Sequence, residues 1–162
     1  MGGVAQFNEH LIKPKVAAER PAIRKLAEME VVNLQKYYVT ISSKDERREY
    51  LKAQMEKMSE NIKNIHPEVV RHWIYEAGFS FPSGHALNAF LMAMLLSYLI
   101  LETLKPPYSS LFFIPFVWAV LVGAARVALG AHSAVDVTVG SLMGVILGAI
   151  LIRSGVIKRL SE

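Results

Sequence analysis

The chain has 162 residues, a length typical of one domain, with 52% hydrophobic residues and a mean hydropathy of +0.30, which is high for a soluble protein. It contains no cysteine, which excludes disulfides, thiolate catalysis and cysteine-based metal sites. The net charge of +4 comes from basic residues mixed with acidic ones, not striped with aromatics, so nucleic-acid binding is not expected.

The charged residues are distributed unevenly along the chain. Of the 18 Lys and Arg and the 14 Asp and Glu residues, only eight follow Glu76: Glu102, Lys105, Arg126, Asp136, Arg153, Lys158, Arg159 and Glu162. The C-terminal half is therefore expected to lie in a membrane and the middle of the chain in water. The N-terminus has no basic stretch followed by an apolar one, so no signal peptide is expected.

The first third of the chain is predicted to be helical. Residues 4–31 have a helical pattern interrupted at Pro14 and Pro21, and residues 22–39 continue it with alanine, leucine and glutamate. Proline at position 21 suits the start of a helix or a sharp turn.

A capping-box sequence, with Ser43 as N-cap and Glu46 three residues later, opens the next segment. It predicts an amphipathic helix of about 20 residues that ends at Pro67. Such a helix is either a lid or membrane-surface helix beside an active site, or an ordinary packed surface helix. A second short helix, 67–77, carries Trp73 and Tyr75, two residue types that gather at membrane interfaces.

Three apolar runs follow: Ala86–Leu104, Ser110–Ala125 (continuing to Leu129) and Val137–Ile152. The first is long enough to cross about 28 Å of a bilayer as a helix. The third carries a glycine at every fourth position, Gly140, Gly144 and Gly148, a spacing that lets membrane helices approach closely. This pattern favours packing within one protomer over dimerisation.

The basic residues next to the apolar runs indicate an orientation. The positive-inside rule places Lys105 and the C-terminal group Arg153, Lys158 and Arg159 on the cytoplasmic side. The opposite side of the membrane then holds residues 20–80 and a set of polar side chains at the ends of the apolar runs: His85, Arg126, His132 and Asp136.

Polar residues form three clusters at these positions, where a bilayer tolerates them only for a function. The first is Lys13 with Arg20, the second is Ser83-Gly84-His85, and the third is Arg126, His132 and Asp136.

His132 and Asp136 are four residues apart, so on a helix they share a face and can hydrogen-bond. A carboxylate on one ring nitrogen fixes the tautomer and leaves the other nitrogen free to attack, which makes His132 a candidate nucleophile. The same pair also occurs as a purely structural pair on helices.

Lys13, Arg20 and Arg126 supply three cations for one phosphate dianion. Ser83, Gly84 and the helix start that follows offer a hydroxyl and backbone N–H groups to the same anion. His85 is then the candidate general acid. Alone, Pro-Ser-Gly-His is also typical of a turn and helix cap.

Together the clusters resemble the signature of the type-2 phosphatidic acid phosphatase superfamily, Lys-x6-Arg-Pro, Pro-Ser-Gly-His and Ser-Arg-x5-His-x3-Asp. The resemblance covers about residues 13–136. Ala125 stands where the family often has Ser, which removes one hydroxyl contact, and we expect a minor effect on binding.

The resemblance implies an all-α fold, a polytopic membrane helix bundle with a phosphatidic acid phosphatase type 2/haloperoxidase-like core and a helical periplasmic segment. Residues 1–162 then form a single lipid phosphatase domain. Residues 1–20 are the end of a membrane helix with the first motif, 21–80 the periplasmic segment, and 81–162 three membrane helices with the second and third motifs. The family usually has six membrane helices, so its N-terminal helices are expected to be absent from this chain.

Residues 71–82 resemble the bacterial phosphatidylglycerophosphate phosphatase B branch most, with lipid A 1-phosphatases as close relatives. The resemblance implies an enzyme of the bacterial inner membrane that hydrolyses a phosphomonoester or pyrophosphate of a membrane lipid, such as phosphatidylglycerophosphate or undecaprenyl pyrophosphate. His132 is its nucleophile and forms a phosphohistidine, Asp136 supports it and His85 is the acid. Lys13, Arg20, Ser83, Gly84 and Arg126 bind the phosphate.

The implied reaction uses neither a metal ion nor another cofactor, and the implied partners are the lipid substrate and the bilayer, with no particular oligomeric state. One alternative is a non-catalytic protein that binds or transports a phospholipid. Another is a structural membrane subunit, which leaves the joint spacing of the motifs to chance.

Overall fold

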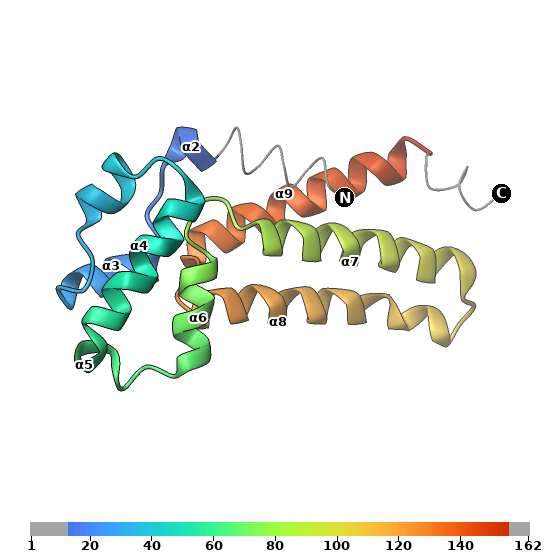
Figure 1. The fold of residues 1–162 in the computed structure, drawn as a ribbon. Helices are drawn as coiled ribbons and strands as arrows, with labels where there is room; N and C mark the ends of the chain where they lie inside the picture. Colours follow the sequence, from blue (N-terminus) through green and yellow to red (C-terminus); the bar gives the residue numbers. More distant parts are fainter. Residues whose placement is uncertain (1–12, 156–162) are drawn as a thin grey trace.

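A computed structural model describes residues 13–155 of the chain (Figure 1). In that range the regular elements are helical and no strand is present, as predicted. In chain order they are α2 (Lys13–Val16), α3 (Pro21–Glu28), the π-helical turn η2 (Lys36–Thr40), α4 (Lys44–Lys57), α5 (Ser59–Ile62), α6 (Pro67–Tyr75), α7 (Gly84–Thr103), the 3-10 turn η3 (Tyr108–Phe113), α8 (Ile114–Ala128) and α9 (Ala134–Arg153).

Three long helices form what we call the bundle, residues 84–153. Gly84–Thr103, Tyr108–Ala128 and Ala134–Arg153 are each long and apolar enough to cross a membrane. These correspond to the three predicted apolar runs. In the bundle α7 lies beside both α8 and α9, as Figure 1 shows, and contacts each of them more extensively than they contact one another.

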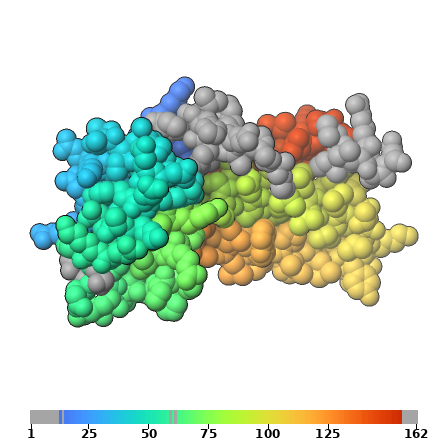
Figure 2. Space-filling model, viewed as in Figure 1, coloured from blue at the N-terminus to red at the C-terminus, as the bar shows by residue number. Residues whose placement is uncertain are grey.

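The shorter helices form the cap, which we define as residues 13–82. Figures 1 and 2 show the cap gathered at the end of the bundle where α7 begins and α8 ends. It has a hydrophobic core of its own, in which Ile23, Leu26, Tyr37 and Leu51 are fully buried. This core decides between the two interpretations of the 44–57 segment, because α4 buries Leu51 and Met55 as a packed helix rather than covering the surface as a lid.

The sequence predicted too few breaks in the cap. The helical pattern does not run from 22 to 39, because α3 ends at Glu28 and Glu30 adopts a left-handed φ of 60°. The reversal turns Val31 and Val32 into the cap core, where they are 2% and 5% exposed. The predicted long amphipathic helix is likewise divided, because α4 ends at Lys57.

The ends of the cap helices agree with the predicted signals. Ser43 is the N-cap of α4, and its Oγ accepts the N–H of Glu46 at 3.1 Å. Pro21 opens α3, and Pro67 opens α6 rather than only ending the helix before it.

The residue type of Trp73 suggested an exposed position at the membrane interface, but Trp73 does not occupy one. It is only 7% exposed, and its indole Nε1–H donates to the Leu129 carbonyl at the end of α8 at 2.7 Å. Trp73 therefore fastens the cap to the bundle, whereas Tyr75 is 67% exposed.

Close packing in the bundle depends on the glycines of α9. A Cβ at Gly144 would overlap the Leu87 carbonyl oxygen of α7, and one at Gly148 would lie 2.6 Å from the Met94 Cβ. The glycine spacing therefore serves packing within one protomer, as the sequence favoured. Large apolar side chains instead cover the outside of the bundle, among them Val117, Val120, Leu121, Leu142, Ile146 and Ile150.

Candidate active site

The three sequence motifs meet where the cap joins the bundle. Backbone hydrogen bonds connect them in pairs: Ser80 N–H to Ala18 O at 2.9 Å, Ala22 N–H to Gly130 O at 2.9 Å, and Ser83 N–H to Asp136 O at 3.0 Å. The first bond joins motif one to motif two, the second joins one to three, and the third joins two to three. The main chain itself therefore sets the spacing between the motifs.

Arg20 is buried, and its guanidinium is bound by the protein. Nε donates to Gly78 O at 2.8 Å and Nη1 to Ala131 O at 2.7 Å. Nη2 donates to Glu76 Oε2 at 2.9 Å and to Phe79 O at 3.2 Å. Four of the five N–H bonds of a guanidinium are thus used, which leaves one on Nη1.

Glu76 bridges two arginines and was not predicted as a site residue. Its Oε2 pairs with Arg20 and its Oε1 with Arg126 Nη2, at 2.9 and 3.0 Å. Burial opposes ionisation of this carboxyl, but the charges of Arg20 and Arg126 outweigh it and lower its pKa to about 2. Glu76 is therefore a fixed anion between two cations.

Arg126 is buried in the last turn of α8, where its positive charge also suits the helix C-terminus. Its Nη2 is held by Glu76, whereas its Nε is buried without a hydrogen-bond partner among the described residues. Among the described residues, the guanidinium of Arg126 therefore has a hydrogen bond at Nη2 and none at Nε.

His132 and Asp136 lie together, but not for the reason predicted. His132 is not on a helix with Asp136, because α9 begins at Ala134 with Ser133 as its N-cap. Asp136 is the third residue of a capping box, in which its Oδ2 accepts the Ser133 N–H at 2.7 Å. The capping box brings Asp136 Oδ2 to 3.8 Å from His132 Nδ1, a distance that is too long for a hydrogen bond.

His132 is 2% exposed and surrounded by positive charge. Burial lowers its pKa, and the charges of Arg20, Arg126 and Lys13 lower it further, while Asp136 opposes them. The imidazole is therefore neutral near pH 7, as the predicted role of nucleophile requires. Lys13, the third of these cations, is buried on α2.

Ser83 and Gly84 form the start of α7, as expected for an anion cradle. Ser83 is fully buried, and its Oγ accepts the Ala86 N–H at 3.3 Å. His85 follows in the first helical turn and is exposed, with Arg126, Glu76 and His132 as its electrostatic neighbours.

Gly140 explains how motif two comes so close to α9. A Cβ at this position would overlap the Ser83 carbonyl oxygen and would also lie 3.4 Å from the Ser83 nitrogen. Any larger residue at position 140 would push the Ser83 segment away from Asp136.

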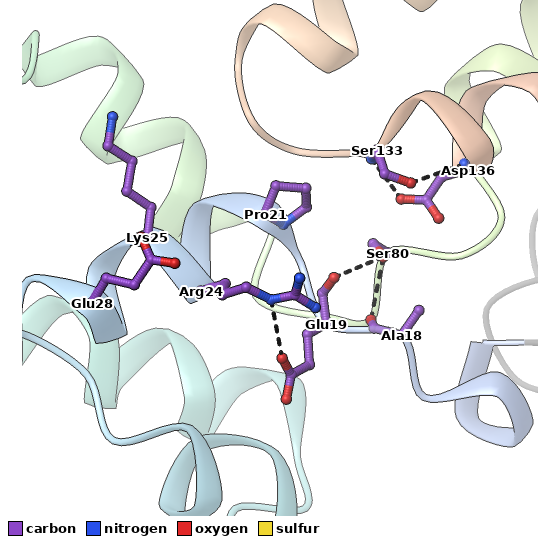
Figure 3. Close-up of a pocket in the computed structure, with 9 residues that line it drawn as sticks. All are labelled: Ala18, Glu19, Pro21, Arg24, Lys25, Glu28, Ser80, Ser133 and Asp136. Carbon is purple, nitrogen blue, oxygen red and sulfur yellow. Dashed lines mark hydrogen bonds and ion pairs between the residues drawn. The ribbon is translucent and has the colours of Figure 1, made fainter.

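A cavity of about 520 Å³ opens beside the site. Figure 3 shows Ser133 and Asp136 on one side of it and the α3 side chains Lys25 and Glu28 on the other. His132 does not line the cavity, which therefore reaches the carboxylate of the pair and not its imidazole. Among residues 13–155, no group of three or more His, Cys, Asp or Glu side chains is placed to hold a metal ion.

All eight predicted site residues lie in the described range, and the structure brings Arg20, Ser83, Arg126, His132 and Asp136 into one connected cluster. Sequence reasoning missed Glu76 and its neighbour His72. One signal pointed to Glu76, because it is the last acidic residue before the apolar half of the chain.

The sequence is similar to those of known proteins. The chain matches the PAP2 superfamily over residues 3–159. It is 36% identical to phosphatidylglycerophosphatase B of Bacillus subtilis (strain 168) over 95 residues, which are 56% of this chain and 45% of the relative. It is 32% identical to phosphatidylglycerophosphatase B of Escherichia coli (strain K12) over 148 residues, 91% of this chain and 54% of the relative.

The chain thus spans about half the length of the curated relatives it matches. The family match, in contrast, covers nearly the whole chain and includes the three motifs that meet at the site. The chain belongs to the PAP2 superfamily.

Proposed function

We propose that the protein is a membrane lipid phosphatase that removes a terminal phosphate through a phosphohistidine intermediate. The observation that carries this proposal is His132, a buried neutral imidazole beside a carboxylate and within the field of three cations. Binding alone needs the cations but neither a nucleophile nor an acid.

In the proposed reaction, His132 Nε2 attacks phosphorus and the bond to the lipid oxygen breaks. The protonated form of His85, which is exposed at the start of α7, gives its proton to that leaving oxygen. Asp136 stabilises the positive charge that develops on the His132 ring once rotation closes the 3.8 Å gap between them. Water then attacks the phosphohistidine, its proton passes to His85, and inorganic phosphate leaves.

The cations stabilise the charge on the equatorial oxygens, the larger part of catalysis in phosphoryl transfer. Arg126 offers the most donors, because Glu76 occupies only its Nη2 among the described residues. Arg20, already bound to four acceptors, contributes its charge and one N–H. Lys13 adds a point charge, and Ser83 and Gly84 form the cradle.

The names of the relatives support phosphatidylglycerophosphate as a substrate. Undecaprenyl pyrophosphate carries the same terminal phosphate on a second phosphate, and we include it. A lipid A 1-phosphatase is the alternative within the same chemistry, and a phospholipid-binding or transport protein is the alternative of another class.

We place the enzyme in the bacterial inner membrane with the site facing the periplasm. Three apolar helices and the bacterial relatives support a multi-pass bacterial membrane protein. The basic residues Lys105 and Arg153 at the other end of the bundle support the periplasmic orientation.

Phosphate release from lipids in detergent micelles tests the proposal. The panel holds phosphatidylglycerophosphate, undecaprenyl pyrophosphate, lipid A and phosphatidate. His132→Ala should lower turnover at least about a thousandfold, because the nucleophile is lost. Vanadate should inhibit and EDTA should not, because the protein's own cations hold the phosphate.

Turnover by His132→Ala close to that of the unaltered protein would refute the mechanism. Loss of activity in EDTA that magnesium restores would indicate another class of phosphatase. Saturable lipid binding without phosphate release from any member of the panel would support the binding or transport alternative.

A further inference from the structure

Among the described residues, three buried side-chain nitrogens have no hydrogen-bond partner: His72 Nε2, Arg126 Nε and His132 Nδ1. Buried polar groups without partners are rare in proteins, and each one calls for an explanation. The proposed reaction explains His132, whose Nδ1 faces Asp136, and gives Arg126 a ligand. It gives no role to His72.

His72 lies on α6 one turn before Glu76, so the two share a face of that helix. This part of α6 packs on the last turn of α8. Glu76 accepts from Arg126 Nη2 at 3.0 Å, and Trp73, next to His72, donates to Leu129 O at 2.7 Å. Of all charged groups, Arg126 acts most strongly on the His72 imidazole.

The two unpaired atoms are chemically complementary. The Nε of an arginine is always a donor, whereas one nitrogen of a neutral imidazole is an acceptor. Burial and the charge of Arg126 lower the pKa of His72, which keeps its ring neutral near pH 7. A buried donor and a buried acceptor therefore lie in the same cluster with their bonds unmade.

We propose that His72 is a positioning residue for Arg126, whose Nε–H its Nε2 accepts when a phosphate binds. This proposal rests on the proposed phosphate site. With Nε held by His72, the two terminal nitrogens of the guanidinium point together at the phosphate oxygens as a bidentate fork. Glu76 holds Nη2 in the structure, and His72 holds the neighbouring Nε once the anion competes for Nη2.

A double-mutant cycle with phosphatidylglycerophosphate tests the proposal in the full chain. His72→Leu removes the acceptor and should lower kcat/KM about tenfold, as expected for a hydrogen bond to a charged group. His72→Gln keeps an acceptor oxygen and should restore kcat/KM to within about threefold. Arg126→Lys has no Nε, so adding His72→Leu to it should lower kcat/KM less than about twofold.

The matched control is His66→Leu, the same substitution at the exposed N-cap of the same helix. It should lower the melting temperature slightly by removing the contact to the Glu68 N–H and leave kcat/KM unchanged. An equal loss from His72→Leu in both Arg126 backgrounds, or no rescue by His72→Gln, would overturn the proposal in favour of a purely structural His72.

Binding of inorganic phosphate, measured by calorimetry, separates this proposal from the proposed reaction. If the protein binds phosphate but hydrolyses no lipid, the reaction fails while the His72 series remains readable in the dissociation constant. His72→Leu should then weaken binding about tenfold and His72→Gln little. If the unaltered protein neither binds phosphate nor hydrolyses any lipid of the panel, both proposals fall.

Discussion

The cap and the bundle bury opposite kinds of side chain. The cap encloses large ones, such as Ile23, Leu26 and Tyr37, and exposes most of its charged residues apart from a few buried ones such as Arg20 and Glu76. The bundle encloses small ones, such as Ala89, Ala93 and Ala119, and exposes large apolar residues. The cap is therefore built like a water-soluble domain, and the bundle is built for a solvent of lipid.

This difference shows which force stabilises each region. Water drives the cap together through its apolar surface, whereas in lipid the bundle gains stability from close van der Waals packing of its helices. The candidate site lies on the border between them, and each region contributes part of it. Substitutions in the two regions should therefore destabilise the protein in different ways.

The largest effect is expected at Glu76, which joins the two regions electrostatically. Glu76→Gln leaves two buried guanidinium groups without their anion, which should cost about 3–5 kcal/mol in the free energy of unfolding. Thermal unfolding in detergent measures the loss. Glu68→Gln, on the same helix but in an exposed pair with Arg71, is the control and should cost less than about 1 kcal/mol.

The pKa of Glu76 gives this prediction a sign in pH. Because the folded-state pKa is about 2 and the ordinary value is 4.5, the stabilisation is present above pH 4.5 and is lost as the pH falls towards 2. The Gln variant should lack this part of the acid sensitivity. Equal acid sensitivity in both proteins would mean that Glu76 does not join cap and bundle through its charge.

The next effect tests the cap alone. Arg47 is buried under the rings of Tyr37, Tyr38 and Phe79, with its guanidinium carbon 4.8 Å from the Phe79 centroid, and donates to Ile41 O at 3.0 Å. Arg47→Met should destabilise the cap by about 2–3 kcal/mol through lost cation–π contacts and hydrogen bonds.

Limited proteolysis should show cleavage within the cap of the Arg47→Met variant while the bundle stays intact. Arg48→Ala is the neighbouring control, because Arg48 stacks on the exposed Tyr75 instead. Simultaneous loss of cap and bundle would contradict their independent stabilisation.

A smaller effect tests the bundle. Gly140→Ala places a Cβ on the Ser83 carbonyl, and overpacking should exceed the gain in helix propensity by about 1–2 kcal/mol. Turnover should fall together with stability, because the added Cβ displaces Ser83 at the start of α7. Ala149→Leu adds more volume on the exposed side of α9 and should change neither property. If Gly140→Ala were tolerated and Ala149→Leu destabilised the protein, α9 would have to face the other helices with the opposite side from the one described.

The smallest effect is a shift in pH. Because its surroundings lower the pKa of His132, the acid limb of kcat/KM should lie below about 6.5, the ordinary value for histidine. Lys13→Met removes one of the charges responsible and should move the limb to higher pH. A limb at or above 6.5 in the unaltered protein would show that burial and the neighbouring cations do not lower the pKa of His132.

Hydrophobic runs predicted the bundle, because that pattern is local in the sequence. The residues that meet at the site were predicted from the resemblance of the three motifs, which lie far apart in the chain, to a known family. The breaks after α3 and α4 were missed because they depend on which residues the cap core can bury, such as Val31. The His132–Asp136 contact was predicted from helical spacing but arises from a capping box. The four acceptors of Arg20 come from distant segments, and no local pattern indicates them.

The backbone bonds between the motifs have a consequence for how such a protein can diversify. Since Ser80, Ala22 and Ser83 fix the motifs through main-chain atoms, the cradle keeps its dimensions whatever side chains surround it. Residues that line the neighbouring cavity, such as Arg24, Lys25 and Glu28, belong to none of these bonds. In the proposed reaction, head-group preference is thus free to change by substitution on α3 while the phosphate chemistry stays the same.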